Sequence, residues 1–72
     1  MDRPPTLGDV VGLPAWLPDR PFRVAEVRDP DLSGHVWIKG WFVNELPRVE
    51  IPYLVPLARL RLLPDPTFGG EP

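Results

Sequence analysis

The sequence predicts a small all-β domain, from the placement of its prolines and the composition of the segments between them. Twelve prolines among 72 residues leave proline-free windows of seven residues or more only at 6–13, 22–29, 31–46 and 57–63. A proline inside a helix removes a hydrogen bond and clashes with the preceding turn, which costs about 3 kcal/mol. Three windows are too short for a helix of typical length, and the fourth has the composition of a strand.

Length and composition narrow the class of protein further. A chain of 72 residues is one domain, and folding at this size buries only about 60% of the surface that the unfolded chain exposes. The absence of cysteine excludes disulfides, thiolate metal sites and thiol catalysis. A net charge of −2 gives no general argument for nucleic acid or an anionic membrane as a partner.

The first part of the chain is expected to hold one short strand and one long loop. The folded domain is predicted over residues 7–63, because the ends at 1–6 and 64–72 are polar, rich in proline or glycine, and expected to be disordered tails. The first strand is expected within 7–12, where glycines bound an apolar run. An irregular loop with three prolines follows at 13–21.

The middle of the chain is expected to form a hairpin. Residues 22–28 and 35–43 are rich in β-branched and aromatic side chains, which is typical of strands. Between them, residues 29–34 combine aspartate, proline, serine and glycine, each of which favours turns.

The last third is expected to hold two shorter strands. Residues 49–53 alternate at period two, but Pro52 cannot donate to a ladder, so this strand should lie at an edge or break there. Leucines three apart in 54–63 fit one helical turn, whereas 60–63 also fits a strand. A single 3₁₀ turn after Pro56, followed by a last short strand, satisfies both signals.

This order of elements resembles that of the SH3-like barrels. The resemblance covers residues 7–63 and is carried by Gly8-Asp9-Val10-Val11, by the long loop after it, and by the closing run Tyr53-Leu54-Val55-Pro56-Leu57-Ala58-Arg59-Leu60-Arg61. It implies a barrel of about five short strands. Barrels of this kind generally imply a binding module for peptides, proteins or nucleic acids rather than a particular chemistry.

The same ending also resembles the type II dihydrofolate reductases, which are tetramers of SH3-like subunits. Their signature is a Val-Gln-Ile-Tyr run immediately before a proline and a short apolar turn. Here Tyr53-Leu54-Val55 precedes Pro56, so the glutamine and the placed tyrosine are absent. The resemblance therefore does not extend to that active site.

The residues available for catalysis or metal binding are few. His35 is the single histidine, and Ser33 lies nearby across a turn glycine, but no third group is placed to orient the imidazole. One histidine without cysteine cannot supply the ligands that zinc needs. The sequence therefore predicts neither an enzyme nor a cofactor.

One turn resembles the first half of an EF-hand calcium loop. Asp29-Pro30-Asp31-Leu32-Ser33-Gly34 places oxygen-bearing residues at alternate positions and glycine at the sixth. The twelfth position is Gly40 instead of the bidentate glutamate, and the flanks are strand-like. A hairpin turn explains the same residues and is the favoured interpretation. Pro18-Asp19-Arg20-Pro21 likewise has the PxxP spacing, and shaping the loop is its favoured role.

The most informative pattern is aromatic. Alternate residues of a strand share a face, and in 35–43 one face carries Val36, Ile38, Gly40 and Phe42. The other face carries His35, Trp37, Lys39, Trp41 and Val43. If this second face meets water, it forms an aromatic strip that Trp16 of the long loop could extend, and such strips usually mark contact sites. The predicted partner-binding residues are Trp16, Trp37, Lys39, Trp41 and His35.

Two structural alternatives stay open at this point. Gly40 could mark a bend or bulge that swings Trp41 inward, in which case the tryptophans would be mainly structural. Arg59 and Arg61 would share a face in a strand and could bind a carboxylate or phosphate, although a solvated pair is the favoured interpretation.

These observations together predict a non-enzymatic protein–protein interaction module, such as an adaptor, a regulator or a small subunit. The expected partner is another protein or a second copy of the chain, and no small-molecule substrate or membrane is expected. The alternative is a barrel that binds single-stranded nucleic acid by stacking bases on the tryptophans. A cytoplasmic location is expected, because no signal peptide or membrane span is recognised in the sequence.

Overall fold

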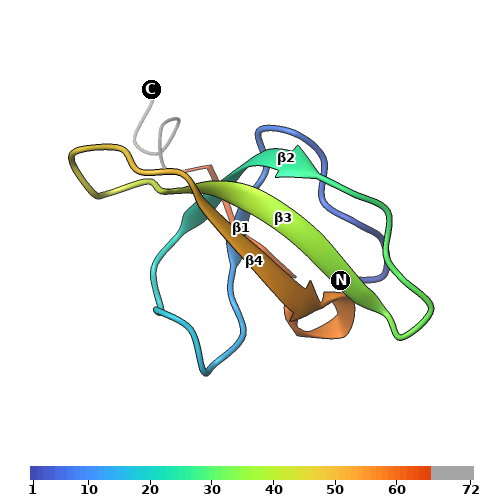
Figure 1. The fold of residues 1–72 in the computed structure, drawn as a ribbon. Coiled ribbons are helices and arrows are strands. Elements are labelled where there is room, and N and C mark those ends of the chain that lie inside the picture. The colour runs from blue at the N-terminus through green and yellow to red at the C-terminus, as the bar shows by residue number, and fades with distance from the viewer. Residues whose placement is uncertain (66–72) are drawn as a thin grey trace.

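The computed structural model describes residues 1–65 and is all-β within them. Five strands form one antiparallel sheet in the order β4-β3-β2-β1-β5 (Figure 1). The strands are β1 (Val10–Gly12), β2 (Phe22–Val27), β3 (His35–Phe42), β4 (Ile51–Pro56) and β5 (Arg61–Leu62), and one 3₁₀ turn, η1 (Leu57–Arg59), precedes β5. The predicted fold class and the 3₁₀ turn before the last strand are therefore confirmed.

The strand β4 differs from its predicted bounds, because it begins at Ile51 and runs through Pro52 to Pro56. Pro52 and Pro56 lie opposite Lys39 and His35 of β3. Since proline has no N–H, both sit at positions that do not hydrogen-bond to β3 and turn their nitrogens to the free side. The prediction of an edge strand is confirmed, and the two prolines make this edge a poor template for an added strand.

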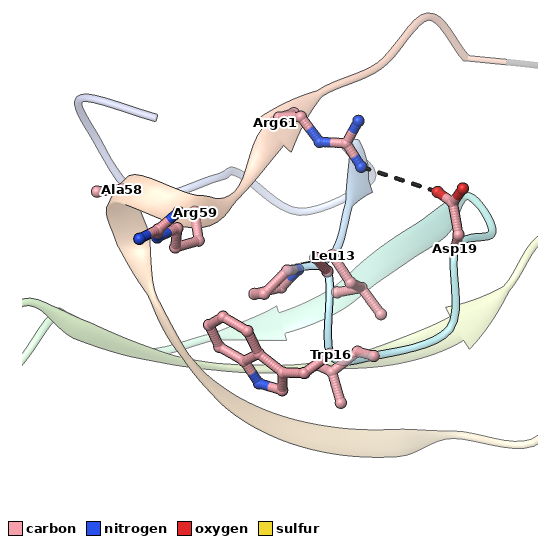
Figure 2. Close-up of a pocket in the computed structure, with 9 residues that line it drawn as sticks. Leu13, Trp16, Asp19, Ala58, Arg59 and Arg61 are labelled. Carbon is pink, nitrogen blue, oxygen red and sulfur yellow. Dashed lines mark ion pairs between the residues drawn. The ribbon is translucent and has the colours of Figure 1, made fainter.

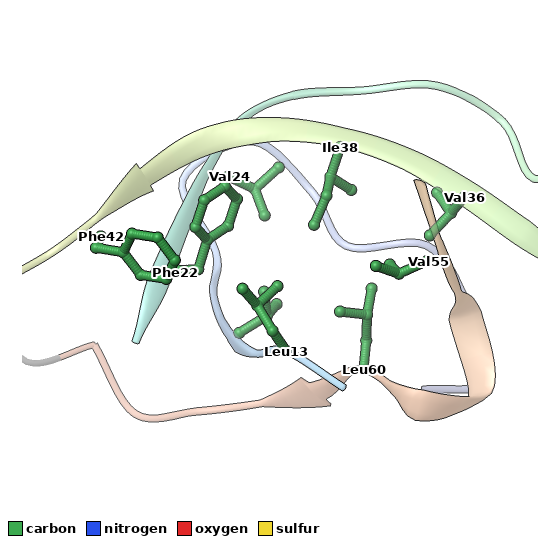
Figure 3. Close-up of a cluster of buried hydrophobic side chains, with 9 residues drawn as sticks. Leu13, Phe22, Val24, Val36, Ile38, Phe42, Val55 and Leu60 are labelled. Atoms are coloured by element: carbon green, nitrogen blue, oxygen red, sulfur yellow. The ribbon is translucent and has the colours of Figure 1, made fainter. Parts of the chain in front are cut away.

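The sheet is curled (Figure 1), and within residues 1–65 no α-helix packs against it. Its core is therefore formed by apolar side chains of the sheet and its connections, on the inner side of the curl. All five strands or their immediate flanks contribute to this core. Figure 3 shows the cluster between β3 and the β5 segment: Val11, Leu13, Phe22, Val24, Val36, Ile38, Phe42, Val55 and Leu60. The rings of Phe22 and Phe42 meet edge to face at 5.2 Å, a favoured aromatic geometry.

The strand β3 alternates strictly between a buried and a half-buried side. Its inward residues Val36, Ile38, Gly40 and Phe42 are all buried, and its outward residues are all partly exposed. The predicted division of this strand into a core face and a second face is confirmed.

Gly40 permits a close approach of two backbones. It lies opposite Val24 of β2, and a Cβ atom at this position would collide with the carbonyl oxygen of Arg23. The β-bulge lies in β2, between Val24 and Glu26, rather than at Gly40. Trp41 keeps its place on the outward side of β3, so of the two alternatives left open by the sequence, the one in which Gly40 swings Trp41 inward is wrong.

The chain ends were both expected to be disordered tails. Within residues 1–6, Pro5 is buried and the terminal ammonium of Met1 donates to the carbonyl oxygens of Leu57 at 3.0 Å and Leu60 at 2.9 Å. Most of the second predicted tail, 66–72, lies outside the described residues. No helix long and apolar enough to cross a membrane is found within residues 1–65.

We expect Gly40→Ala to lower the free energy of unfolding by about 2–4 kcal/mol, because the new methyl group meets rigid backbone of the neighbouring strand. Gly12→Ala is the matched control, since the three atoms nearest to a Cβ there belong to the movable guanidinium of Arg61, and it should cost about 1 kcal/mol or less. Urea denaturation of both variants tests this, and equal losses would contradict the close approach at Gly40.

Candidate functional site

The sheet has an outer face, which is the side of β2, β3 and β4 that points away from the core. Three neighbouring strands bring aromatic, apolar and charged side chains together there. The outer face consists of Arg23, Glu26, Arg28, His35, Trp37, Lys39, Trp41, Pro52, Leu54 and Pro56. Four of the five residues that the sequence nominates for partner binding therefore share one surface.

The bulge in β2 decides which of its residues reach the outer face. Ala25 is skipped in the pairing with β3, so Glu26 lies opposite Lys39 and Val27 opposite Ile38. The extra residue shifts the alternation of β2 by one position. As a result Val27 packs against the core, whereas Glu26 and Arg28 turn to the outer face.

Trp37 is held between a cation and an exposed leucine. The guanidinium of Arg28 lies over the indole at 4.3 Å from the ring centroid, and the Arg28 N–H donates to the Trp37 carbonyl oxygen at 3.0 Å. On the other side, Leu54 of β4 lies directly opposite Trp37 and is 61% exposed. This part of the outer face is an apolar patch with a cation stacked on it.

Trp41, like Trp37, has an arginine stacked on its ring. The guanidinium of Arg48, from the loop between β3 and β4, lies over its ring at 4.3 Å. Arg23 of β2 lies directly opposite Trp41. Its guanidinium donates to both carboxylate oxygens of Asp65, at 3.0 and 2.7 Å, and this hydrogen bonding raises the pKa of Arg23. Each half-buried indole of β3 thus has one of its faces covered by an arginine.

Lys39 lies between the two indoles along β3, and carboxylates flank it. Its Nζ is 3.9 Å from Glu26 and 3.6 Å from Glu50. These groups are partly solvated, and such ion pairs contribute less than about 1 kcal/mol each. Their main effect is to neutralise the positive charge in the middle of the outer face.

His35 belongs to a hydrogen-bonded turn. Asp31 Oδ1 accepts from the N–H and the hydroxyl of Ser33 and from the N–H of His35, and Ser33 Oγ lies 2.9 Å from His35 Nδ1. The Ser33–Asp31 contact of 2.6 Å occupies the one hydroxyl proton, so the imidazole is not arranged to take that proton from a nucleophile. These bonds lower the pKa of Asp31, chiefly through Ser33.

The predicted hairpin turn is confirmed, because β2 and β3 pair on either side of it. The calcium alternative finds little support in this geometry, since Asp31 Oδ1 already accepts hydrogen bonds from its own turn. Within residues 1–65 no group of three or more histidine, aspartate or glutamate side chains is placed to hold a metal ion.

Trp16 does not extend the outer face, so the expectation of one continuous aromatic strip is wrong. It lies in the loop between β1 and β2 and lines a groove of about 510 Å³ against η1 and β5 (Figure 2). The groove is lined by Leu13, Pro14, Ala15, Trp16, Leu17, Asp19, Ala58, Arg59 and Arg61. Leu13, directly after β1, is part of the core, and Trp16 lines the groove together with Arg59 and Arg61 instead of joining the outer face.

Sequence reasoning missed the arginines that stack on the indoles. Arg28 and Arg48 reach Trp37 and Trp41 through strand pairing and a loop, so no local pattern marks them. Leu54 was missed although a signal existed: an apolar residue between two prolines at period two shares their exposed side of the strand.

No protein-family model matches this chain, and no curated protein or solved structure matches it. The likeness to SH3-like barrels therefore rests on the order of its elements alone.

We expect Asp31→Asn to destabilise the protein at neutral pH, because the charged carboxylate accepts its hydrogen bonds more strongly than an amide does. A carboxyl whose pKa is lowered by folding stabilises the native state above its ordinary value of 3.8, and this contribution is lost as the pH falls through the lower folded pKa. The stability difference between the native chain and Asp31→Asn should therefore shrink below pH 3.8.

Urea denaturation over a pH series measures this difference. Asp29→Asn is the matched control in the same turn, because Asp29 makes no side-chain hydrogen bond within residues 1–65. A stability difference for Asp31→Asn that is independent of pH would contradict the role of its charge.

Proposed function

We propose that this chain is a non-enzymatic protein-interaction module whose contact surface is the outer face. The observation that carries the proposal is the pairing of Trp37 with the exposed Leu54 across β3 and β4. Tryptophan and arginine are the residue types enriched at the energetic centre of protein interfaces, and here Arg28 stacks on Trp37 while Leu54 adds exposed apolar surface beside the ring. The SH3-like order of elements, whose members are generally binding modules, supports the same proposal by analogy.

The charges around this apolar patch suit a protein partner. Glu26, Lys39 and Glu50 are all partly exposed and form a polar rim of both signs. A rim of this kind gives orientation and selectivity, while the apolar centre supplies most of the affinity.

The stacked arginines add preformed hydrogen-bond donors. A guanidinium held flat on an indole loses less freedom on binding and presents the donors at its edge to a carboxylate. Arg48 has no carboxylate partner among residues 1–65. A partner with an acidic group beside its apolar anchor would therefore complement this surface.

Nucleic acid is the less favoured partner for the same face. Base stacking needs open aromatic faces, whereas Arg28 and Arg48 each cover one side of an indole. Two carboxylates beside Lys39 also oppose a phosphate backbone. The net charge of −2 points in the same direction.

The partner is expected to contact side chains rather than to add a strand. The free edge of the sheet next to the outer face is β4, where Pro52 and Pro56 supply no N–H. A second copy of the chain is included among the partners, because the outer face could pack against itself about a two-fold axis.

Leu54→Ser should weaken binding to the partner about tenfold, because it removes one apolar side chain from the centre of the contact. Leu62→Ser is the matched control: Leu62 is 60% exposed against 61% for Leu54, but it lies in β5 at the opposite edge of the sheet. Affinity capture followed by quantitative mass spectrometry compares the two variants for the same bound protein, and light scattering compares them for self-association. Equal effects of both substitutions would refute the assignment of this face.

Single-stranded oligothymidylate should leave the tryptophan emission of the Trp16→Phe variant unchanged at low salt. The physical reason is that an arginine covers one face of Trp37 and of Trp41 and that two carboxylates flank Lys39. Trp16, which is 63% exposed, is replaced by phenylalanine for this measurement so that the emission comes from the outer face. A saturable quench that disappears as salt is added would instead favour the nucleic-acid alternative.

A further inference from the structure

The groove beside η1 is a second surface with its own chemistry, separate from the outer face. Its floor contains the buried residues Leu13 and Pro14, and Trp16 stands at its side with 63% of its surface exposed. The volume of about 510 Å³ falls in the range of about 300–1,000 Å³ that is usual for ligand sites. A tryptophan this exposed above an apolar floor leaves both its ring and the floor available to a ligand.

The charges of the groove are positive and weakly compensated. Arg59 has no ion pair with any carboxylate in residues 1–65. Arg61 has one carboxylate neighbour there, Asp19, at 4.0 Å, and the side chain of Asp19 is 99% exposed. Figure 2 shows Arg59 and Trp16 lining the same hollow, with Arg61 and Asp19 joined by the dashed line.

The shape of the groove suits a chain that passes through it. Most of its lining is exposed, including Ala15, Trp16, Ala58 and Arg59, so it is an open channel rather than a closed cavity. Guanidinium groups recognise planar carboxylates through paired hydrogen bonds. An exposed indole beside them offers a flat surface for a proline or another apolar side chain.

We propose that this groove binds an extended acidic peptide segment of another protein. An apolar side chain or proline of the peptide packs on Trp16, and an adjacent aspartate or glutamate pairs with Arg59. A second carboxylate displaces Asp19 from Arg61. A nucleic acid fits less well, because stacking of successive bases needs several aromatic rings and the described lining of the groove has one, Trp16.

This proposal does not rest on the function proposed for the outer face. The two surfaces share no residue, so each can be altered by substitutions that leave the side chains of the other unchanged. If both bind, the chain connects two proteins and acts as an adaptor with two contact surfaces.

The experiment selects peptides from a displayed library of random dodecamers against the full chain. Enriched peptides should contain aspartate or glutamate next to proline or an apolar residue. Each is then synthesised with a matched peptide in which Asn and Gln replace Asp and Glu, and the matched peptide should bind at least about tenfold more weakly. In nitrogen-15 spectra, the indole N–H signal of Trp16 should shift on binding while those of Trp37 and Trp41 stay in place.

Substitutions on the protein supply the second arm. Arg59→Ala and Trp16→Ala should each weaken binding of the acidic peptide about tenfold or more, and both side chains are exposed, so the fold should survive. Arg59→Glu should lose the acidic peptide and gain one in which lysine replaces the pairing carboxylate. Arg48→Ala is the control, because it removes an arginine from the outer face and should leave peptide binding unchanged.

Four results would overturn the proposal. The first is a selection without enrichment of acidic sequences. The second is an acidic peptide that binds Arg59→Glu as tightly as the native chain. The third is displacement of the peptide by oligothymidylate at physiological salt, which would make nucleic acid the occupant of the groove. Loss of binding in Leu54→Ser would tie the peptide to the outer face and would also count against it.

Discussion

The pairing of β3 with both of its neighbours is the constraint on which the rest of the structure depends. This strand sends Val36, Ile38 and Phe42 into the core and places two tryptophans on the opposite side. A slip of one residue would exchange the two faces and bury the charged side. The missing side chain of Gly40 lets the backbone of β2 come close enough to hold the register.

The bulge in β2 follows from that close pairing and determines the chemistry of the outer face. It lets Val27 contribute to the core and turns Glu26 and Arg28 toward Lys39 and Trp37. Without the extra residue, the alternation of β2 would place Arg28 against the core, where an unpaired charge is costly. The bulge therefore adds Val27 to the core and also places Arg28 over the half-buried ring of Trp37.

A sheet that encloses its own core, with no helix in residues 1–65, has two different kinds of surface. One is the outer face, where side chains of three strands meet. The other is the seam where the loop after β1 meets η1, which leaves the groove beside Trp16. The two strand edges offer few free backbone groups for pairing with a partner strand, because β4 contains Pro52 and Pro56 and β5 is only two residues long. Recognition by this fold is therefore expected to use side chains rather than the backbone.

The sequence by itself determined the strand class, the order of the elements, the turn at 29–34 and the two faces of β3. These properties are local: proline removes donors wherever it stands, and alternation depends on neighbours two residues apart. Only the tertiary structure decided the register of β4, the bulge in β2, and the position of Trp16 beside Arg59 instead of Trp37. Those features depend on contacts between segments far apart in the chain, and such contacts form only when the whole sheet curls around its core.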